Sequence, residues 1–411
     1  MKRILFVDDD ARILDGIRRM LRSKRNEWEV EVALGGEAAL KACETRSFDV
    51  IVSDMRMPFM DGAMLLSRVK ETYPAMARII LSGYSDKDAA NRALSVAHRF
   101  IAKPCDPEEL QITVESVCAL QSILTAPELR QIGGGIGNLP SLSSTYHELG
   151  AAITGPDVSI DQIARIVEKD PAISAKLLQL VNSAFFGLRQ DVTSIHGAVS
   201  YLGINTIVNL ALVVQVFRVF QPSTGIAGQV IEQMWDHAHR TAVLAGRLPV
   251  KGGMRDMTVI AALLHDVGKL ALASAAPKKF EAVFALAKSK GCKLVDAELE
   301  SLGTTHAELG AYVMGLWGIP SIAVEAIAHH HCPRRVPHSG FDPTVAVFVA
   351  NVLDHGSGTL TRPLSKEALV ALFDPEDLEG LGLAGQMDGL VRILEESAPV
   401  AQKPAEKHQT A

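Results

Sequence analysis

Three short apolar segments of this chain each run into charged residues, and this pattern constrains the fold more than any other feature. The charged ends are Asp8, Asp9 and Asp10 after Ile4–Val7, Asp54 after Val50–Ser53, and Lys103 after Phe100–Ala102. Apolar strands that alternate with helical stretches predict βα units and a doubly wound parallel sheet. Because the carboxyl ends of such strands line one crevice, the acidic side chains and the lysine are expected to converge there.

Crowded carboxylates repel one another unless a cation neutralises them. Magnesium suits a site with few carboxylates, several waters and phosphate oxygens, so the pattern predicts a site that accepts a phosphoryl group. Ser82 ends another apolar segment and could donate its hydroxyl to a phosphoryl oxygen. Asp61 and Gly62 are typical of a turn that precedes a helix.

The first 120 residues resemble the receiver domain of two-component response regulators. The resemblance rests on Val7-Asp8-Asp9, Asp54-Met55-Arg56-Met57-Pro58, Asp61-Gly62, Leu81-Ser82-Gly83 and Lys103-Pro104. It implies a phospho-acceptor at Asp54, a magnesium ion bound with the help of Asp8 and Asp9, and a sensor histidine kinase as partner. It also implies a switch hydroxyl at Ser82 and a phosphoryl clamp at Lys103. Phe100 stands at the place of the switch aromatic, where it can act only by packing because it has no hydroxyl.

The chain has 411 residues, which predicts more than one domain, since single cores rarely exceed about 250 to 300 residues. A capping box at Ser159 and an Asp170-Pro171 pair predict helix starts in the second half, where strand-like alternation is absent up to about residue 355. The expected division is a receiver at 1–124, a flexible glycine-rich linker at 125–138, an all-helical domain at 139–355, a helical extension at 356–398 and a disordered tail at 399–411. The fold class is therefore a flavodoxin-like α/β domain followed by an all-α domain.

Eight of the thirteen histidines lie between His237 and His338. Imidazoles together with a carboxylate form the ligand set of zinc, iron or manganese. This region resembles the HDOD domain, a helical relative of the HD phosphohydrolases. The resemblance runs through Leu139-Pro140, Asp170-Pro171, Leu180-Val181-Asn182-Ser183, Trp235-Asp236-His237, Leu263-Leu264-His265-Asp266-Val267-Gly268-Lys269, His306-Ala307-Glu308 and His330-His331-Cys332-Pro333. It implies a regulatory or scaffold module that acts by protein association.

The same resemblance leaves an enzyme alternative open. Active HD relatives that cleave cyclic di-GMP place metal ligands where this chain has His237, His265, Asp266, His306, His330 and His331. Against catalysis, their Gly-Tyr-Pro signature is missing, and Asn351 stands where they carry a late metal-binding aspartate. Asp354 would replace it only if the helix register shifted. The favoured interpretation is a non-catalytic output domain, and a metal-dependent phosphohydrolase is the alternative.

Composition limits partners and location. A net charge of -6 gives no reason to expect nucleic acid as the main partner, and the five scattered cysteines form no Cys-x-x-Cys pair, which indicates a reducing cytoplasm. The chain starts directly with a strand rather than a signal peptide, and no uninterrupted apolar run of about 18 residues predicts a membrane span. His239, His329 and His338 are interpreted as ordinary solvent-facing or hydrogen-bonded residues. The downstream protein stays unidentified, and a homodimer is one candidate assembly.

Overall fold

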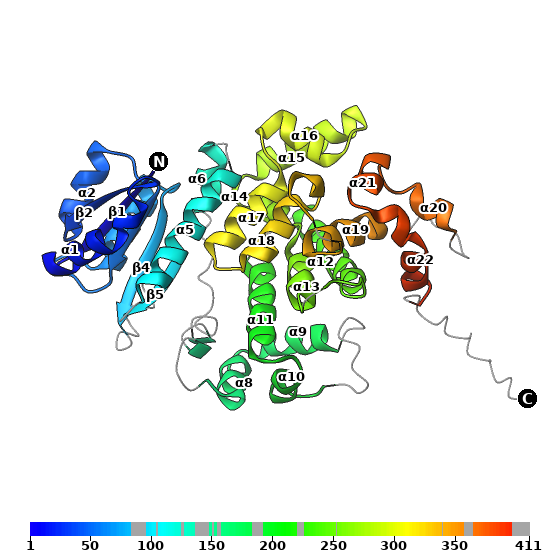
Figure 1. The fold of residues 1–411 in the computed structure, drawn as a ribbon, viewed down its shortest axis with the longest axis horizontal. Coiled ribbons are helices and arrows are strands. Elements are labelled where there is room, and N and C mark those ends of the chain that lie inside the picture. Colours follow the sequence, from blue (N-terminus) through cyan, green and yellow to red (C-terminus); the bar gives the residue numbers. More distant parts are fainter. Residues whose placement is uncertain are drawn as a thin grey trace, which may run out of the picture.

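The structure is a computed structural model that describes residues 1–83, 96–103, 106–124, 127–135, 148–149, 152–153, 158–182, 192–219, 226–251, 253–338, 340–356 and 365–396. An α/β part forms one end of the molecule and a helical part forms the rest, with α5 (Pro107–Ile123) and α6 (Pro127–Gly135) between them (Figure 1). The predicted sequence of an α/β domain and an all-helical domain is confirmed.

The sheet of the α/β part has five parallel strands in the order β2-β1-β3-β4-β5, which is a doubly wound topology. The strands are β1 (Lys2–Asp8), β2 (Trp28–Leu34), β3 (Val50–Asp54), β4 (Ala77–Gly83) and β5 (Arg99–Lys103). Val7 pairs with Ser53, and Gly83 pairs with Lys103, so the charged strand ends lie along the same edge.

Helices cover both faces of the sheet because successive strand residues point to opposite sides. Leu5 and Val7 share a core with α2 (Gly36–Thr45) and α3 (Gly62–Thr72), as part of one buried cluster. Ile4 and Phe6 belong to the other cluster, which includes residues of α1 (Ala11–Met20) and α5. This second cluster continues without a break into the helical part, so the two parts share one hydrophobic core.

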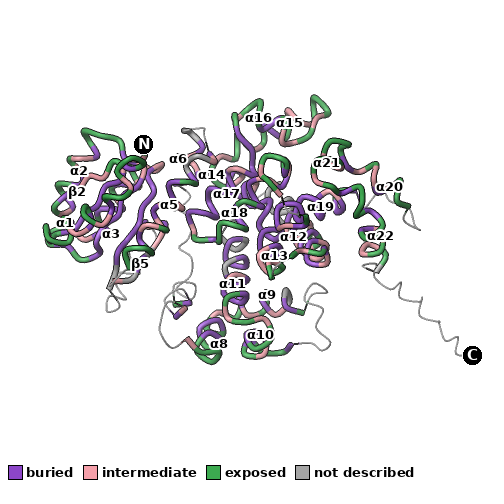
Figure 2. Tube along the Cα trace, viewed as in Figure 1, coloured by how far each residue is buried: buried purple, intermediate pink, exposed green. Residues whose placement is uncertain are grey.

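The helical part is built around buried helices from widely separated segments. Its helices are α8 (Ile160–Glu168), α9 (Pro171–Val181), α10 (Ile195–Leu202), α11 (Ile204–Val219), α12 (Ile226–Ala245), α13 (Arg255–Leu264), α14 (Val267–Ala275), α15 (Pro277–Lys290), α16 (Leu294–Leu302), α17 (His306–Leu316), α18 (Ser321–His329) and α19 (Pro343–Gly356). α13, α17 and α19 are mostly buried, whereas α8 and α16 carry much exposed surface (Figure 2). Short helices α20 (Lys366–Val370), α21 (Pro375–Gly380) and α22 (Met387–Glu396) follow.

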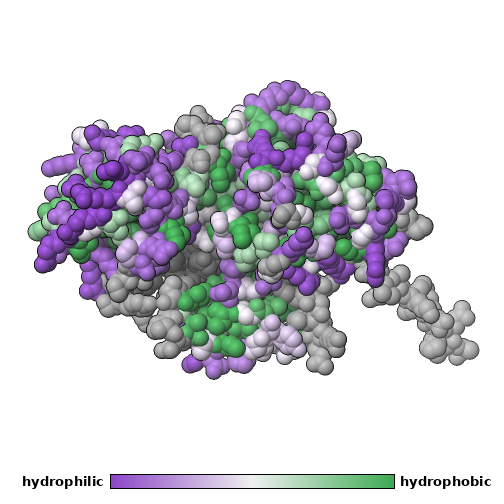
Figure 3. Space-filling model, viewed as in Figure 1, coloured by the Kyte–Doolittle hydropathy of each residue, from purple (hydrophilic) through white to green (hydrophobic). Residues whose placement is uncertain are grey.

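Two predicted helix starts are present as expected. Ser159 caps α8 by accepting a hydrogen bond from the Gln162 amide at 3.2 Å, and Asp170 accepts one from the Ile173 amide at 3.2 Å at the start of α9. The surface near α8 shows apolar side chains (Figure 3). Ile160, the first residue of this helix, is exposed. The predicted tail at 399–411 lies outside the described residues.

The expected flexible linker needs a correction. Gly133 and Gly134 are buried residues of α6 rather than part of a loose hinge. A Cβ at Gly134 would lie 2.0 Å from the Pro74 carbonyl oxygen, and one at Gly133 would lie 2.7 Å from the Tyr312 ring. Glycine is therefore required at these two positions, where α6 packs closely against Pro74 of the sheet domain and Tyr312 of α17. The sequence alone does not show whether a glycine provides flexibility or permits close packing.

The contact between the sheet domain and α6 is reinforced by the buried guanidinium of Arg78. Arg78 of β4 is completely buried, and its guanidinium donates to the carbonyl oxygens of Val96 at 2.6 Å and Gly134 at 2.9 Å. Burial lowers the pKa of Arg78 to about 10. Carbonyl oxygens surround the charge in place of water, which ties the sheet domain to α6.

Among the residues that the structure describes, one segment is long and apolar enough to span a membrane by length and composition, namely Arg255–Ala275. It is the stretch of α13 and α14, interrupted by His265 and Asp266, and 78% of its most apolar window is buried inside the protein. Burial in the protein core explains the apolar composition of Arg255–Ala275.

Candidate functional sites

Asp8, Asp9, Asp54 and Lys103 form what we call the carboxylate site. One oxygen of each aspartate lies within 4.8 Å of the others. Lys103 reaches across from β5, and its Nζ lies 2.6 Å from Asp54 Oδ1 and 3.1 Å from Asp8 Oδ2. The strand order brings together the four residues that the sequence pattern singled out.

The charges of the carboxylate site are not balanced. Asp8 and Asp54 are only 2% and 8% exposed, so little water screens them. Burial raises the pKa of Asp54, although Lys103 opposes the shift. Burial alone would lower the pKa of Lys103, but its contacts with Asp54 and Asp8 raise it. Three carboxylates face one ammonium, and this oxygen-rich donor set fits a magnesium ion.

The loop after Asp54 is tightly closed. The Gly62 amide donates to the Met55 carbonyl oxygen at 2.9 Å, and Asp61 caps α3 by accepting from the Met64 amide at 2.8 Å. A Cβ at Gly62 would lie 2.3 Å from the Asp54 carbonyl oxygen, so a side chain there would push the acceptor loop away. Ser82 is the second-last residue of β4 and Phe100 lies in β5, but their side chains lie outside the described part of the chain.

Phe59 at the tip of this loop was not singled out by its sequence. Its side chain is 100% exposed, and its backbone adopts φ 67°, a left-handed conformation that a phenylalanine rarely takes. Among the described residues, it is the one position other than glycine with positive φ. A strained and exposed aromatic residue therefore lies beside the carboxylate site.

The second cluster, which we call the histidine site, gathers the six residues His237, His265, Asp266, His306, His330 and His331. They come from α12, the α13–α14 junction, the first position of α17 and the residues after α18. Their nitrogen and oxygen atoms form two groups with metal-ligand spacing, one of His237, His265 and Asp266 and one of Asp266, His306, His330 and His331. Asp266 belongs to both groups, so its two oxygens are placed between them.

Hydrogen bonds from the outer ring nitrogens fix how these histidines face the centre. Nδ1 of His265 lies 2.7 Å from the Ala262 carbonyl oxygen, and Nδ1 of His330 lies 2.7 Å from that of Ile327. Nδ1 of His237 lies 2.7 Å from Asp354 Oδ2, and Nδ1 of His306 lies 2.7 Å from Glu298 Oε2. A carbonyl or carboxylate oxygen can only accept, so each Nδ1 must donate. Neutral rings then present the Nε2 lone pair inward.

The inward nitrogens approach one another closely. His237 Nε2 lies 3.1 Å from His265 Nε2, and His306 Nε2 lies 3.0 Å from His331 Nε2. Two acceptors at this distance repel unless a proton or a metal ion lies between them. His330 Nε2 and Asp266 Oδ1 are buried and accept no hydrogen bond. The donor set of imidazole nitrogens with a shared carboxylate fits zinc, iron or manganese.

The electrostatics agree with that geometry. Burial lowers the pKa of His265 to about 4 and holds the pKa of His330 and His331 well below the usual value. Burial alone would raise the pKa of Asp266, but Lys269 and the neighbouring histidines hold it well below its usual value. Lys269 Nζ lies 2.6 Å from Asp266 Oδ2. A neutral imidazole beside an ionised carboxylate is the form that binds a metal.

Asn351, which was weighed against catalysis, and Asp354, which was considered as its replacement, both lie in α19. Asp354 accepts from Arg240 Nε at 2.7 Å as well as from His237, so it orients His237 from outside the cluster. Asn351 is buried, and its Oδ1 has no hydrogen-bond partner. Asp354 therefore engages the site without a register shift, but as a support for a histidine.

Sequence reasoning missed Glu298, which is 2% exposed and holds both the ring and the amide of His306. It lies in a separate helix, α16, where a glutamate at this spacing looks like any solvated residue. Of the histidines interpreted as ordinary, His338 contacts Asp342 and the Pro333 carbonyl oxygen, and His239 is half-buried. His329 differs, because its Nδ1 is buried without a hydrogen bond.

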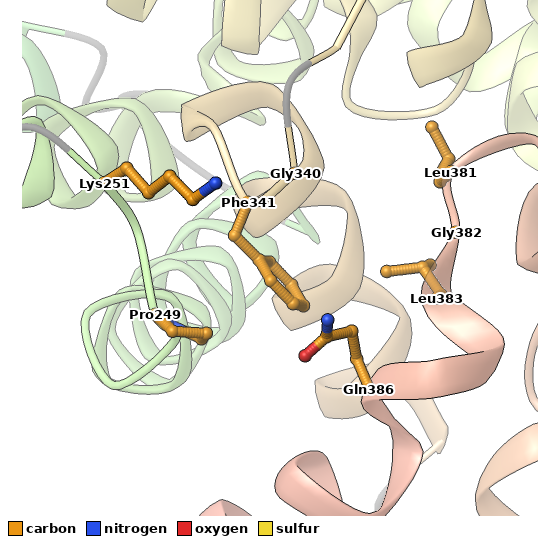
Figure 4. A pocket seen from close by; sticks show the side chains of 8 residues that line it. All are labelled: Pro249, Lys251, Gly340, Phe341, Leu381, Gly382, Leu383 and Gln386. Carbon is orange, nitrogen blue, oxygen red and sulfur yellow. The ribbon is translucent and has the colours of Figure 1, made fainter.

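A cavity of about 220 Å³ lies apart from both sites (Figure 4). It is lined by Pro249, Lys251, Gly340, Phe341, Leu381, Gly382, Leu383 and Gln386. Lys251 is the one charged residue among these eight, and neither an acid nor a histidine faces the cavity. The arrangement offers no acid–base or metal chemistry, so the two clusters remain the candidate sites.

Comparison with known proteins agrees with this division. The family model of the response regulator receiver domain matches residues 4–115, and that of the HDOD domain matches residues 139–333. An uncharacterized protein of Treponema pallidum is 30% identical over 213 residues, which cover 51% of this chain and 40% of that protein. The transcriptional regulatory protein ZraR of Escherichia coli O157:H7 is 29% identical over 197 residues, 44% of each chain. The chain thus spans less than half the length of these relatives.

Among solved structures, a putative phosphohydrolase from Shewanella amazonensis SB2B is similar with a TM-score of 0.49 and 20% identity. The similarity covers 66% of this chain and 98% of that one.

Proposed function

We propose that this chain, a response regulator that joins a receiver domain to an HDOD domain, is phosphorylated on Asp54 and thereby changes how its helical domain associates with another protein. The observation that carries the proposal is the carboxylate site. A nucleophilic carboxylate and two further acids converge there with oxygens within 4.8 Å of one another, and a lysine contacts the nucleophile. This arrangement supports phosphoryl transfer, because the acids bind a cation and the lysine contacts phosphoryl oxygens.

The transfer proceeds from a phosphohistidine of a sensor kinase. An Asp54 carboxylate oxygen attacks phosphorus and forms the O–P bond of an acyl phosphate, while the P–N bond breaks and the imidazole nitrogen keeps the electron pair. Asp8, Asp9 and Asp54 would hold a magnesium ion, which would supply positive charge against the phosphoryl oxygens. Lys103 already lies 2.6 Å from Asp54, so its ammonium contacts the new phosphoryl group.

The response to phosphorylation begins at the same strand ends. The acyl phosphate adds up to about two negative charges and new acceptor oxygens. Ser82 at the end of β4 donates its hydroxyl to one of them, and Phe100 in β5 repacks. Because Phe100 carries no hydroxyl, its contribution is packing alone.

The output is a change in protein association in the cytoplasm. Relatives named as transcriptional regulators share less than half of this chain, and the net charge of -6 does not favour a nucleic-acid surface. The partners are a sensor kinase and a downstream protein, and a homodimer is a candidate assembly. We assign the receiver to residues 1–124, the output domain to 139–355 and a helical extension to 356–398, with 125–138 as the connection.

Acetyl phosphate and magnesium test the acceptor directly. We expect the intact protein to gain the mass of one phosphoryl group, and Asp54→Ala to lose that gain because the nucleophile is gone. Asp15→Asn is the matched control, since Asp15 is an exposed acid of α1. A gain that persists in Asp54→Ala, or that maps to another residue, would refute the assignment.

A second candidate function is a metal-dependent phosphohydrolase, and the converging Nε2 atoms of the histidine site favour it. His237, His265, Asp266, His306, His330 and His331 would hold zinc, iron or manganese, and such an ion supplies Lewis-acid activation of water when bound. Asn351 offers a neutral amide where a second carboxylate would balance a pair of dications. The favoured interpretation is therefore a site that binds metal and does not hydrolyse cyclic di-GMP.

Metal analysis and a hydrolysis assay on the untagged full chain distinguish these alternatives. The protein is supplied with iron, manganese or zinc under reducing conditions, and linear dinucleotide and GMP are followed over time. We expect bound metal without turnover. Metal-dependent turnover that disappears in both His265→Ala and Asp266→Ala would establish the enzyme instead.

A further inference from the structure

Helix α17 connects the histidine site to the receiver domain, and its two ends have different surroundings. It begins at His306, whose Nε2 lies 3.1 Å from Asp266 Oδ1 in the histidine site. Its 11 residues span about 16 Å at the usual helical rise. It ends at Leu316, against the receiver domain. One helix therefore has its first residue in the histidine site and its last residue in contact with the receiver domain.

The N-terminal end of α17 is held firmly. Thr305 and Glu308 form a capping box, in which Thr305 accepts from the Glu308 amide and Glu308 accepts from the Thr305 amide. Glu298 accepts hydrogen bonds from both the amide and the ring of His306, at 2.9 and 2.7 Å. A displacement of the helix must therefore move the His306 ring or break these contacts.

The C-terminal end is held by the receiver domain through Arg99. Its guanidinium donates to the Leu316 carbonyl oxygen at 3.1 Å and to that of Gly315 at 2.7 Å. The last carbonyl groups of a helix have no partners within the helix, and they carry the negative end of its dipole. A planar guanidinium with two donors suits this position better than a single ammonium.

The sides of α17 leave little freedom for a small adjustment. A Cβ at Gly315 would lie 2.2 Å from Leu120 of α5, and one at Gly310 would lie 2.9 Å from the Gly268 amide of α14. Ten of the eleven residues are buried, and Glu308 is the exception. Closely packed interiors transmit a displacement rather than absorb it, because voids are few.

Arg99 lies on the strand that carries the phosphoryl clamp. Both Arg99 and Lys103 belong to β5, four residues apart, which corresponds to about 13 Å along a strand. Lys103 contacts Asp54 at one end of this strand, and Arg99 holds α17 at the other. The contacts thus form a continuous path from Asp54 through β5 and α17 to His306.

We propose that Arg99 is a positioning residue that couples the phosphorylation state of Asp54 to the position of α17 and of His306 in the histidine site. This inference rests on the proposed phosphorylation of Asp54. When Lys103 turns to the phosphoryl oxygens, β5 shifts and Arg99 changes its hold on the Gly315 and Leu316 carbonyl groups. Phosphorylation then changes the geometry of the histidine site as well as the surface of the helical domain.

Hydrogen exchange on the full chain tests the coupling. Amide exchange in residues 306–316 is compared with and without acetyl phosphate and magnesium, while intact mass measures phosphorylation of the same samples. We expect phosphorylation to change exchange in this segment by about fivefold or more, the lower end of usual allosteric couplings. Arg99→Ala is expected to reach the same degree of phosphorylation and to lose the change in 306–316.

Two further variants keep the test decisive. Arg99→Lys preserves the charge but offers one point of contact, so we expect a smaller change than in the wild type; it replaces Arg99→Ala if that variant does not fold. Arg46→Ala is the matched control, because Arg46 is a receiver arginine that contacts Glu29 and Glu31 instead of α17. It should behave as the wild type.

The outcomes separate this inference from the proposed function. A phosphorylated wild type whose 306–316 segment does not change would overturn the coupling alone. So would an Arg99→Ala protein that keeps the full change. A wild type that gains no phosphoryl mass would instead overturn the proposed function, and the coupling with it.

Discussion

The carboxylate site and the histidine site each place a buried aspartate in contact with a lysine. They differ in which groups surround this pair and remain without a partner. Lys103 lies 2.6 Å from Asp54, and Lys269 lies 2.6 Å from Asp266. In the first site the remaining groups are carboxylates, so the excess is negative charge. In the second they are imidazoles, and those of His265, His330 and His331 are kept neutral by burial, so the excess is lone pairs. Oxygen donors suit a hard ion such as magnesium, and imidazole donors suit a transition metal.

If the histidine site binds a metal, Asp266 should matter most, because both ligand groups share it. We expect Asp266→Asn to weaken zinc binding by about a hundredfold or more, since the amide offers no charge and only one oxygen. Asp236→Asn is the control, because Asp236 is exposed on α12 beside His237. The measurement is a zinc titration against a competing chelator, and equal affinity in the two variants would remove the histidine site from consideration.

The two sites should also respond to acid with opposite signs. Burial holds the pKa of His265 at about 4 and that of His330 and His331 well below the usual value. These rings stay neutral in the folded chain, whereas the unfolded chain takes up protons below a pKa of about 6.5. Their contribution to stability is therefore present above that pH and is lost as the pH falls. For three rings the loss is on the order of 3 kcal/mol between pH 6.5 and 5.5 in metal-free protein.

Two groups oppose this trend. Burial would lower the pKa of His306, but Glu298 and Asp266 raise it, so its contribution is lost as the pH rises. Burial raises the pKa of Asp54, which likewise favours the folded chain at low pH. Urea unfolding at pH 7.5, 6.5 and 5.5 measures the net slope. His330→Gln should flatten it, and His196→Gln, which replaces an exposed histidine, should not. A slope that His330→Gln leaves unchanged would show that this ring does not carry the effect.

The outer contacts of the histidine site allow a finer comparison. Glu298 fixes the ring of His306, and loss of such a supporting carboxylate typically weakens a metal site by about 10-fold to 100-fold. We expect Glu298→Gln to fall in that range, because the amide still accepts a hydrogen bond but has no charge. Glu300→Gln on the same helix is the control, since Glu300 pairs with Lys290 at the surface. Zinc affinity that does not distinguish the two variants would contradict a supporting role for Glu298.

The sequence predicted the carboxylate site almost completely, and the reason is topological. Residues that directly follow parallel strands must meet at one edge, so Asp8, Asp54 and Lys103 could be brought together without coordinates. The resemblance likewise named the six residues of the histidine site. It did not name Glu298 or assign a role to Lys269, because contacts between separate helices leave no fixed spacing in the chain.

The glycine-rich segment shows why the rest was harder to predict. Gly133 and Gly134 indicated flexibility, but the same residue type also permits close approach between backbones, and packing against Tyr312 and Pro74 decides between the two uses. Arg99 gave no signal either, since an arginine at the start of a strand is ordinary until a helix terminus is found beside it. Both features depend on how the domains meet, which local pattern does not determine.

The smallest expected effect concerns the backbone next to the carboxylate site, where the strain is conformational rather than electrostatic. Phe59 adopts φ 67° with a fully exposed side chain, so it gains no burial in return for an unfavourable conformation. Asparagine tolerates the left-handed region, and we expect Phe59→Asn to raise the free energy of unfolding by about 0.5 to 1 kcal/mol. Leu34→Asn is the control, because Leu34 is also exposed but does not have positive φ. Urea unfolding of both variants measures the difference, and a Phe59→Asn protein less stable than the wild type would mean that the aromatic ring makes a stabilising contact that its exposure does not reveal.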